Sequence, residues 1–334
     1  FGSSVSKFSV NTYLGRPIGR YLFLVVAMSA SKSELSSGSL VPTAAGVLAG
    51  VALGFGIARA QKKKAWEVLG DKSGGAHGSM MISQNRRHLL KPLDQKGRSE
   101  VEVRNYDLLR RTSLGPFLCG FHGVVQLNGC DYMEIDSAYA GMTGKCATLD
   151  IKLGKVTWED NADPAKIAKE TKNFEEHYAK SSAAEGFRVA GMKAGGLELS
   201  AKKNLKARGS LKTSEFAQWL LPAFFAGGPG YGPLPDGRAG ECEPEARGTT
   251  PDMQAAREIL CHLKVLQAAS ELGFGFTIRA SSLLFTREMK DGGSWNVKLI
   301  DLAHVTPSED KRDHNFCDGL ANFISVFEAW SGGK

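Results

Sequence analysis

The chain has 334 residues, of which 42% are hydrophobic, so it can bury a core large enough for one large domain or two lobes. Its formal net charge of +7 favours an anionic partner, which leaves phosphorylated metabolites, nucleic acid and an anionic membrane open. The 6 cysteines and 7 histidines show no C-x-x-C or H-x-x-x-H spacing, so neither a zinc site nor a dense disulfide scaffold is predicted, and we expect reduced thiols.

The first 65 residues differ in composition from the rest of the chain. Residues 1–33 have no acidic side chain and predict a targeting segment or a disordered tail. Residues 40–58 form an uncharged run of about 19 residues, long enough to cross a bilayer, with basic residues directly after it. A membrane anchor, a transit peptide and an amphipathic presegment are the alternatives, so membrane contact through residues 40–58 remains open.

Short strands and one helix are predicted next. A glycine-rich stretch at 66–81 precedes a strand at 88–92 that carries Lys91 near its end. Residues 99–102 have the form of a capping box and predict a helix to Leu109. We prefer the cap as the role of Glu102; the alternative is an ion pair with Lys91.

A hairpin and a strand of alternating character follow. Residues 123–127 and 132–136 are strand-like and are separated by Asn-Gly, a hairpin dipeptide. In Cys146–Gly154, apolar residues alternate with Asp150 and Lys152, which predicts a half-buried strand with both charges on one face. Solvent-facing partners on an edge strand are the alternative.

The next segment is rich in lysine. Asp163 and Pro164 predict the start of a helix to about Lys180, on which Lys166 and Lys169 share a face. Lysines on a helix commonly form a solvated surface, and phosphate binding is the alternative. A second basic run lies at 202–212, and residues 227–249, rich in Gly, Pro and charged residues, predict a flexible insertion.

The C-terminal part predicts two helices around a hairpin. Thr250 and Pro251 predict the start of a helix that ends near Gly273. Strands at 281–288 and 295–303 should form a hairpin that brings Asp301 close to the serines at 281 and 282. A last amphipathic helix follows, with an apolar stripe of Leu320, Phe323, Ile324 and Phe327.

Four separated segments, in this order, resemble the inositol polyphosphate kinases. Cys146–Gly154 is similar to their P-x-x-x-D-x-K-x-G signature, and 186–192 to their G-F-R-I-x-G-M segment. Residues 281–284 match S-S-L-L, and 300–304 resemble I-D-F-A-H. The resemblance covers roughly Trp66 to the C-terminus, and four motifs in order are far more specific than any one of them.

The resemblance implies an α+β fold of two lobes. A small N-lobe with an antiparallel sheet would span 66–138, and a larger C-lobe with the inositol phosphate site would span 139–334. The implied activity is transfer of the γ-phosphate of ATP, with Mg²⁺, to an inositol polyphosphate, and nucleic acid is not expected as a partner. The implied compartment is the cytoplasm or nucleus, unless residues 1–65 anchor the chain in a membrane or direct it to an organelle. Neither the preferred inositol phosphate nor the oligomeric state follows from the sequence.

The resemblance also assigns roles to residues. Catalysis is expected to depend on Lys152, Asp150 and Asp301, where Asp150 also contacts the ribose. ATP would be bound by Lys91, by Asp136 and Ala138 at the base, and by Asp150 and Asp301. Metal ligation is assigned to Asp301 with support from Ser282. Substrate phosphates are expected at Lys152, Lys166, Lys169, Lys193 and His304, while Arg188 braces its strand or binds substrate.

Some residues depart from the family pattern. Cys146 replaces the usual proline, Leu302 the usual phenylalanine and Asp136 the usual glutamate. The Ala-His pair after Asp301 resembles both the multikinase branch and the hexakisphosphate kinase branch, and the second of these makes inositol pyrophosphates. Two further hypotheses are a membrane-tethered inositol-phosphate-binding scaffold whose activity has lapsed, and a kinase of inositol lipid head groups.

Overall fold

The computed structural model of the chain describes residues 66–69, 79–93, 97–194, 197–199, 211–226, 250–310 and 312–332, all within the unit 60–334. Within these ranges, none of the helices has the length and apolar character that crossing a bilayer requires. The predicted N-terminal segment 1–65, with its apolar run at 40–58, lies outside the described residues. So do the predicted insertion at 227–249 and most of the basic run at 202–212.

The first sheet is antiparallel, with the strand order β1-β2-β3-β5-β4. Asn128 and Gly129 connect β4 to β5 at φ values of 53° and 77°. Two successive positive φ values characterise the type I′ turn, whose twist matches the strands that it joins, so the predicted hairpin is confirmed. The strands are β1 (Trp66–Val68), β2 (Met81–Ser83), β3 (His88–Pro92), β4 (Phe121–Leu127) and β5 (Cys130–Asp136).

Helix α1 (Arg98–Leu109) does not begin with the predicted capping box. It begins two residues earlier than a box at 99–102 requires, with Gly97 in place of Ser99 as the N-cap, at φ 73° and without a side-chain capping bond there. Glu102 is buried and accepts a hydrogen bond from Lys91 Nζ at 2.8 Å. The preference for Glu102 as a cap is therefore wrong, because the lysine offers this buried carboxylate a full charge where a backbone N–H offers only a partial one.

The second sheet is also antiparallel, with the order β11-β10-β6-β7-β8. Along β6, half-buried and buried residues alternate without exception, as the sequence predicts for this strand. Its strands are β6 (Cys146–Leu153), β7 (Phe187–Ala194), β8 (Leu197–Leu199), β10 (Ser282–Glu288) and β11 (Trp295–Ile300). A two-stranded sheet pairs β9 (Phe276–Ile278) with β12 (Val305–Pro307).

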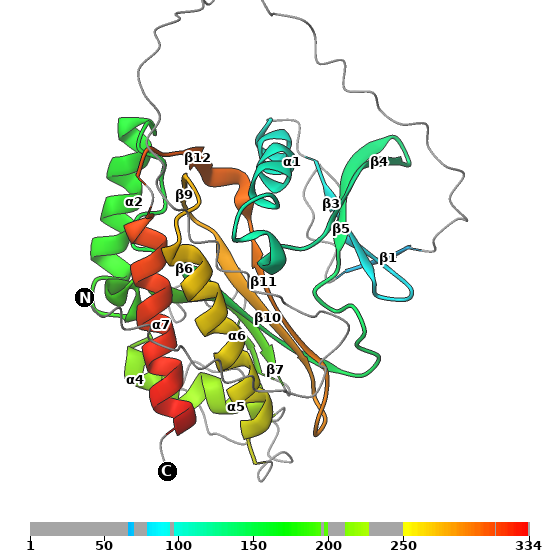
Figure 1. Cartoon of the computed structure of the whole chain (residues 1–334), viewed down its shortest axis with the longest axis vertical. Coiled ribbons are helices and arrows are strands. Elements are labelled where there is room, and N and C mark those ends of the chain that lie inside the picture. Colours follow the sequence, from blue (N-terminus) through cyan, green and yellow to red (C-terminus); the bar gives the residue numbers. More distant parts are fainter. Residues whose placement is uncertain are drawn as a thin grey trace, which may run out of the picture. The chain divides into compact units, whose positions relative to one another are not determined.

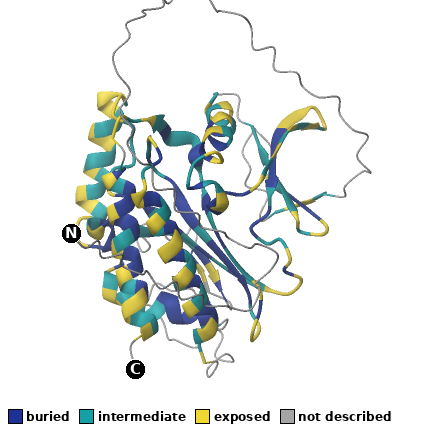
Figure 2. Ribbon diagram, viewed as in Figure 1, coloured by how far each residue is buried: buried dark blue, intermediate teal, exposed yellow. Residues whose placement is uncertain are grey.

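Helices cover the apolar face of the second sheet. Figure 1 shows α6 and α7 lying side by side, and Figure 2 shows that their buried faces and the strands of this sheet form the core. The ring of Phe323 on α7 lies 5.5 Å from Phe187 of β7 and 5.7 Å from Phe285 of β10, centroid to centroid. The polar face of the sheet is thereby left for the site. The covering helices are α4 (Thr213–Glu215), a π-helical turn (Phe216–Leu220), α5 (Leu221–Ala226), α6 (Met253–Glu271) and α7 (His314–Gly332).

The predicted helices are found, with small shifts at their ends. Asp163 caps α2 (Pro164–His177) by accepting from Ala165 N at 2.7 Å, as predicted. Helix α6 begins after Asp252, whose side chain accepts from Ala255 N at 2.9 Å, so Thr250 is not its cap. Aspartate is among the strongest capping residues, and its carboxylate satisfies a first-turn N–H group. The remaining elements are short 3₁₀ turns at Gly115–Phe117, Ser182–Glu185 and Leu302–His304.

Candidate active site

The polar face of the second sheet carries Asp150 and Lys152. Lys152 pairs across the sheet with Ser282 of β10 and Arg188 of β7, and Asp150 with Leu284 and Gly191. Because directly paired residues project to the same face, these side chains share the face that α6 and α7 leave uncovered. The strands thus place an acid and a base about 7 Å apart along β6, as the alternating sequence predicts.

Asp301 enters this face from the end of β11. The strand stops at Ile300, three residues before the predicted end, because Asp301 adopts the left-handed conformation at φ 61° and ψ 63°. This conformation is costly for a residue with a side chain, although Asp tolerates it better than most. The turn brings the carboxylate within 3.0 Å of Lys91 Nζ on the first sheet. Asp301 and Lys91, 210 positions apart, therefore meet.

Lys91 lies between two carboxylates. Its ammonium donates to Glu102 Oε1 at 2.8 Å and to Asp301 Oδ1 at 3.0 Å. Burial lowers the pKa of Lys91, but the negative charges of Asp301 and Glu102 outweigh this and leave it raised. For Asp301, burial raises the pKa, and Lys91, Lys152 and Arg98 together leave it lowered. Both groups are thus held in their charged forms.

Lys152 lies close enough to Asp150 and Asp301 for their negative charges to affect its pKa. Its Nζ donates to the backbone oxygen of Ala280 at 2.8 Å, which fixes the side chain beside the start of β10. Burial lowers its pKa, and the negative charges of Asp301 and Asp150 partly oppose that change. The four charged residues Lys91, Asp150, Lys152 and Asp301 consequently belong to one constellation.

Ser282 lies in the same constellation, next to Asp301. It is fully buried, and it pairs with Ile300, the residue before Asp301. Its Oγ has no hydrogen-bond partner among the described residues. A buried hydroxyl that lacks a partner is costly, so a further group is expected to bind there.

A second group of charged residues surrounds His304. Nδ1 of His304 contacts Glu159, and Nε2 contacts the guanidinium of Arg98. Glu159 also accepts from Lys166 Nζ at 2.8 Å. Burial raises the pKa of Glu159, but the hydrogen bonds from Lys166 and His304 contribute to lowering it to about 2. Two predicted substrate residues, Lys166 and His304, are therefore joined by one carboxylate.

No sequence pattern identifies two members of this second group, Glu159 and Arg98, as site residues. Glu159 lies in a loop without periodic pattern, and Arg98 lies at the start of α1, 206 positions from His304. Only the folded chain brings them together. Arg188 projects from β7 opposite Lys152, and its guanidinium lies 4.7 Å from the ring centroid of Tyr178. Its two roles, bracing of the strand and substrate binding, stay predictions.

Two of the predicted substrate lysines are not brought to these groups. Lys169 is exposed on α2. Lys193 is exposed and pairs with Thr148 of β6, four residues before Lys152. At the rise of a strand this places its Cα about 13 Å from that of Lys152 along the sheet.

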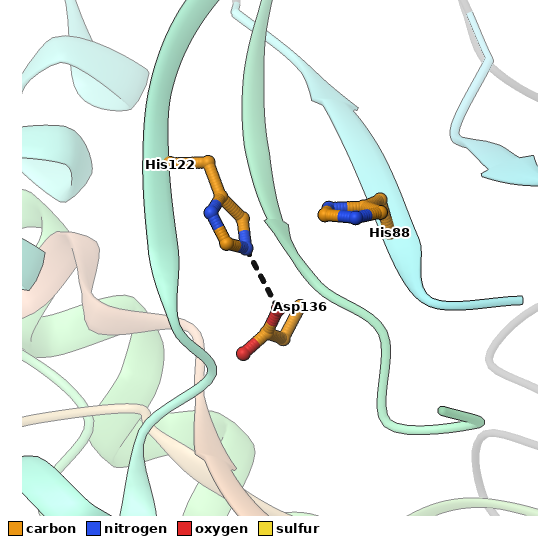
Figure 3. A group of neighbouring side chains, drawn as sticks. All are labelled: His88, His122 and Asp136. Carbon is orange, nitrogen blue, oxygen red and sulfur yellow. Dashed lines mark hydrogen bonds and ion pairs between the residues drawn. The ribbon is translucent and has the colours of Figure 1, made fainter. Parts of the chain in front are cut away.

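The predicted base-binding segment follows β5. The carbonyl of Ala138 accepts from Thr286 Oγ1 at 2.6 Å and from Asn296 Nδ2 at 2.9 Å, which ties this segment to the second sheet. The carboxylate of Asp136 faces His122, whose Nε2 lies 2.7 Å from Oδ1 (Figure 3). The backbone of this segment, rather than the side chain of Asp136, is thus the part to which the base-binding role can be assigned.

Comparisons with known proteins agree with the resemblance. The family described as inositol polyphosphate kinase matches residues 132–328. Inositol polyphosphate multikinase alpha of Arabidopsis thaliana is 25% identical over 268 aligned positions, and the match covers 75% of this chain and 89% of that protein.

Two solved structures share the fold. The inositol phosphate multikinase of S. cerevisiae, solved with ADP and Mn²⁺, has a TM-score of 0.55 at 19% identity and covers 73% of this chain and 99% of its own. Another inositol phosphate multikinase has a TM-score of 0.52 at 21% identity, over 68% of this chain and 98% of its own. With more than half of its length matched by the family, and with this fold, the chain belongs to the inositol polyphosphate kinase family and is a phosphotransferase that resembles the multikinases.

Proposed function

We propose that the chain transfers the γ-phosphoryl group of ATP to a hydroxyl or phosphate of an inositol polyphosphate, with Mg²⁺ as the metal and with multikinase-like use of substrates. The observation that carries this proposal is the constellation in which Lys91 of the first sheet meets Asp301, beside Asp150 and Lys152 on the second sheet. Phosphoryl transfer requires the protein mainly to position reactants and to neutralise charge, and this constellation supplies both cations and a metal-binding acid.

The donor set near Asp301 suits a hard divalent cation. Asp301 is half-exposed and ionised, and the Oγ of Ser282 is without a hydrogen-bond partner among the described residues. Mg²⁺ binds through one or two carboxylates together with water and phosphate oxygens, so these two residues are its proposed protein contacts. When bound, the metal neutralises charge on the phosphate oxygens. The yeast multikinase structure contains ADP and Mn²⁺, which supports nucleotide and metal use here.

The nucleotide is assigned to residues that join the two sheets. Lys91, which Glu102 holds in place from α1, would bind the phosphates. The backbone at Asp136 and Ala138 would bind the base, and Asp150 the ribose. Since the carbonyl of Ala138 is already held by Thr286 and Asn296, the segment is rigid where the base would rest.

Lys152 is assigned to the transferred group. It lies on β6 between Asp150 and the end of β11, and its ammonium is fixed by the Ala280 carbonyl at 2.8 Å. A cation held in place before the reaction stabilises negative charge that develops on the migrating phosphoryl group and on the acceptor oxygen. Lys152 therefore acts as a fixed charge and not as a proton donor.

The inositol phosphate is assigned to the second charged group. Lys166 and His304 now share the carboxylate of Glu159, and Arg98 lies on the other side of the His304 ring. Substrate phosphates would replace Glu159 as the partner of the Lys166 ammonium and of His304 Nδ1, because a phosphate carries more charge and more acceptor oxygens. Lys169 and Lys193 are proposed as outer contacts for substrates with further phosphates.

The test is turnover of a panel from inositol trisphosphate to hexakisphosphate, with product identification. Lys152→Ala and Asp301→Asn should each lower kcat by about 10²- to 10³-fold, because each removes a fixed charge from the transition state. Lys172→Ala, which removes an exposed lysine paired with Glu176 on α2, is the control and should leave kcat unchanged. Undiminished turnover in Lys152→Ala would contradict the assignment. Product formed only from hexakisphosphate would favour the pyrophosphate-forming branch, and binding without product would favour the scaffold.

A further inference from the structure

Three side chains of types that can ligate a metal lie together on the first sheet. His88 projects from β3, His122 from β4 and Asp136 from the end of β5, and one ligand atom from each lies within 4.8 Å of the others (Figure 3). Nε2 of His122 lies 2.7 Å from Asp136 Oδ1, and the two imidazole centroids are 4.8 Å apart. Nothing in the proposed kinase mechanism uses either histidine.

A β-bulge in the first sheet brings these three residues together. His88 and Asp136 are direct partners across β3 and β5 and so share a face. On β4 the register shifts between Phe121 and Gly123, so that His122 is the extra residue of a β-bulge. A bulge redirects a side chain, and here it aims the imidazole at Asp136. Gly123, at φ 126°, accommodates the distorted backbone.

A buried carboxylate orients one of the histidines. Glu134, two residues before Asp136 on β5, is buried, and its Oε1 lies 3.1 Å from Nδ1 of His88. Histidines that bind metals characteristically donate their second ring N–H to a carboxylate, which fixes the tautomer and makes the ligating nitrogen more basic. Since Nδ1 faces Glu134 at ion-pair distance, we assign Nε2 as the ligand atom of His88.

We propose that His88, His122 and Asp136 form a binding site for a borderline divalent transition metal, for which Zn²⁺ is the probe. Two imidazole nitrogens and one carboxylate oxygen form a donor set that favours Zn²⁺ and its neighbours over Mg²⁺ and Ca²⁺, which prefer oxygen alone. Three protein ligands leave a fourth position for water or another group. The dispersed spacing of the three residues explains why the sequence predicts no zinc site.

The three ligand atoms need to move only slightly closer together to bind one metal ion. Ligand atoms around a tetrahedral Zn²⁺, with bonds of 2.0 to 2.1 Å, lie ~3.3 Å apart, so the longest separation has to shrink by ~1.5 Å. His122 can supply this movement, because its side chain is 40% exposed and lies on the edge strand of the sheet. Asp136 binds the metal through its side chain, whereas the proposed contact with the base uses its backbone.

The experiment titrates Zn²⁺ into the full chain, purified without a histidine tag and stripped of metal, against a chromogenic chelator and without nucleotide. We expect His122→Ala and Asp136→Asn each to weaken binding of one equivalent by at least about tenfold, and Glu134→Gln by about 10- to 100-fold. His177→Ala is the matched control, since His177 also lies beside a carboxylate, that of Glu176. This variant should bind Zn²⁺ as tightly as the original chain does. Excess Mg²⁺ should not displace the bound equivalent.

Substitution by Co²⁺ separates this site from the cysteines. A site of nitrogen and oxygen ligands gives visible bands without the near-ultraviolet charge transfer of a cobalt–thiolate bond, and His122→Ala should abolish them. Equal Zn²⁺ affinity in the original chain and in His122→Ala would overturn the proposal, as would a thiolate spectrum. His122 is exposed, so this variant is expected to fold even if a change at buried Glu134 prevents folding. The measurement contains no nucleotide or inositol phosphate, so its outcome is independent of the proposed kinase roles.

Discussion

Lys91 is held by two carboxylates that differ in their surroundings. Glu102 is buried on α1, with its side chain 6% exposed, whereas Asp301 is 48% exposed at the end of β11. A metal that binds Asp301 takes away one partner of the lysine and leaves the other. In the proposed mechanism, Glu102 is therefore the residue that keeps the ammonium in position when the metal binds Asp301, and it acts through Lys91 without touching the substrate.

Glu102→Gln should raise the KM for ATP more than it lowers kcat. The change removes a hydrogen bond between charged groups, worth about 1.5–3 kcal/mol, so kcat/KM for ATP should fall by about 10- to 100-fold. Steady-state kinetics with varied ATP checks this, with Glu100→Gln, an exposed acid in the first turn of the same helix, as the control. A variant that melts earlier but keeps its KM for ATP would show that Glu102 only stabilises the fold.

The predicted and the missed site residues differ in how the fold brings them together. Asp150 and Lys152 could be predicted to share a face, because strand alternation is a local property. The pairing of Glu102 with Lys91 competes with a local cap, and only the buried position of the carboxylate decides between them. Arg98 and His122 carry no local signal, since their partners are 206 and 14 positions away. Glu159 lies 145 positions from His304, which only the folded chain brings to it.

At the scale of elements, Glu288 joins the β10–β11 hairpin to the loop before β6. Its Oε1 accepts from the backbone N–H groups of Thr143 at 2.7 Å and Gly144 at 3.0 Å, and its Oε2 pairs with Lys290 at 2.9 Å. The side chain is 3% exposed. The hydrogen bonds from Lys290, Gly144 and Thr143 lower its pKa to about 2. The loop that leads into the catalytic strand is thus fixed by one carboxylate.

Glu288→Gln should destabilise the chain and make its free energy of unfolding depend less on pH in the acid range. Because the folded pKa is depressed to about 2, the carboxylate contributes stability that is complete above its ordinary pKa of about 4.5 and is lost as the pH falls from about 4.5 towards 2. The free energy of unfolding at pH 7 should drop by about 1–3 kcal/mol, and the variant should lose less stability on acidification. Denaturant unfolding at a series of pH values measures both.

Asp291→Asn is the control for this change, because Asp291 is exposed at the tip of the same hairpin. It should unfold as the original chain does at every pH. A Glu288→Gln variant with the same acid dependence as the original chain would contradict the assigned role of the carboxylate.

The sequence predicts most elements of this fold but places several ends incorrectly. The Asn-Gly hairpin, the central strand and the last helix follow from positive φ preference, alternation and an apolar stripe. Helix α6 starts after Asp252 because its carboxylate reaches a first-turn N–H group. Strand β11 ends early because Asp301 leaves the strand conformation, which a pattern of apolar residues cannot indicate.

At the scale of the whole described unit, three of the contacts that join the first sheet and α1 to the second sheet lie around Asp301 and the segment after β5. They are the ion pair between Lys91 and Asp301, the bonds that hold the Ala138 carbonyl, and a buried hydrogen bond from Asn105 Nδ2 to the Leu302 carbonyl at 2.7 Å. The last of these lies directly after Asp301. It holds the turn that carries Asp301, the proposed metal ligand, and it does so from α1, the helix that also contains Glu102.

Asn105→Ala tests whether this contact matters for activity. The variant leaves the buried carbonyl of Leu302 without its donor, which should cost about 1–3 kcal/mol of unfolding free energy. Because Asp301 loses the support of its neighbour, kcat should also fall, by about tenfold, at temperatures where the variant remains fully folded. Asn322→Ala is the matched control, since Nδ2 of Asn322 also donates to a backbone carbonyl at 2.7 Å, but on the exposed side of α7. A variant that loses stability and keeps its kcat would show that α1 holds the sheets together without positioning Asp301.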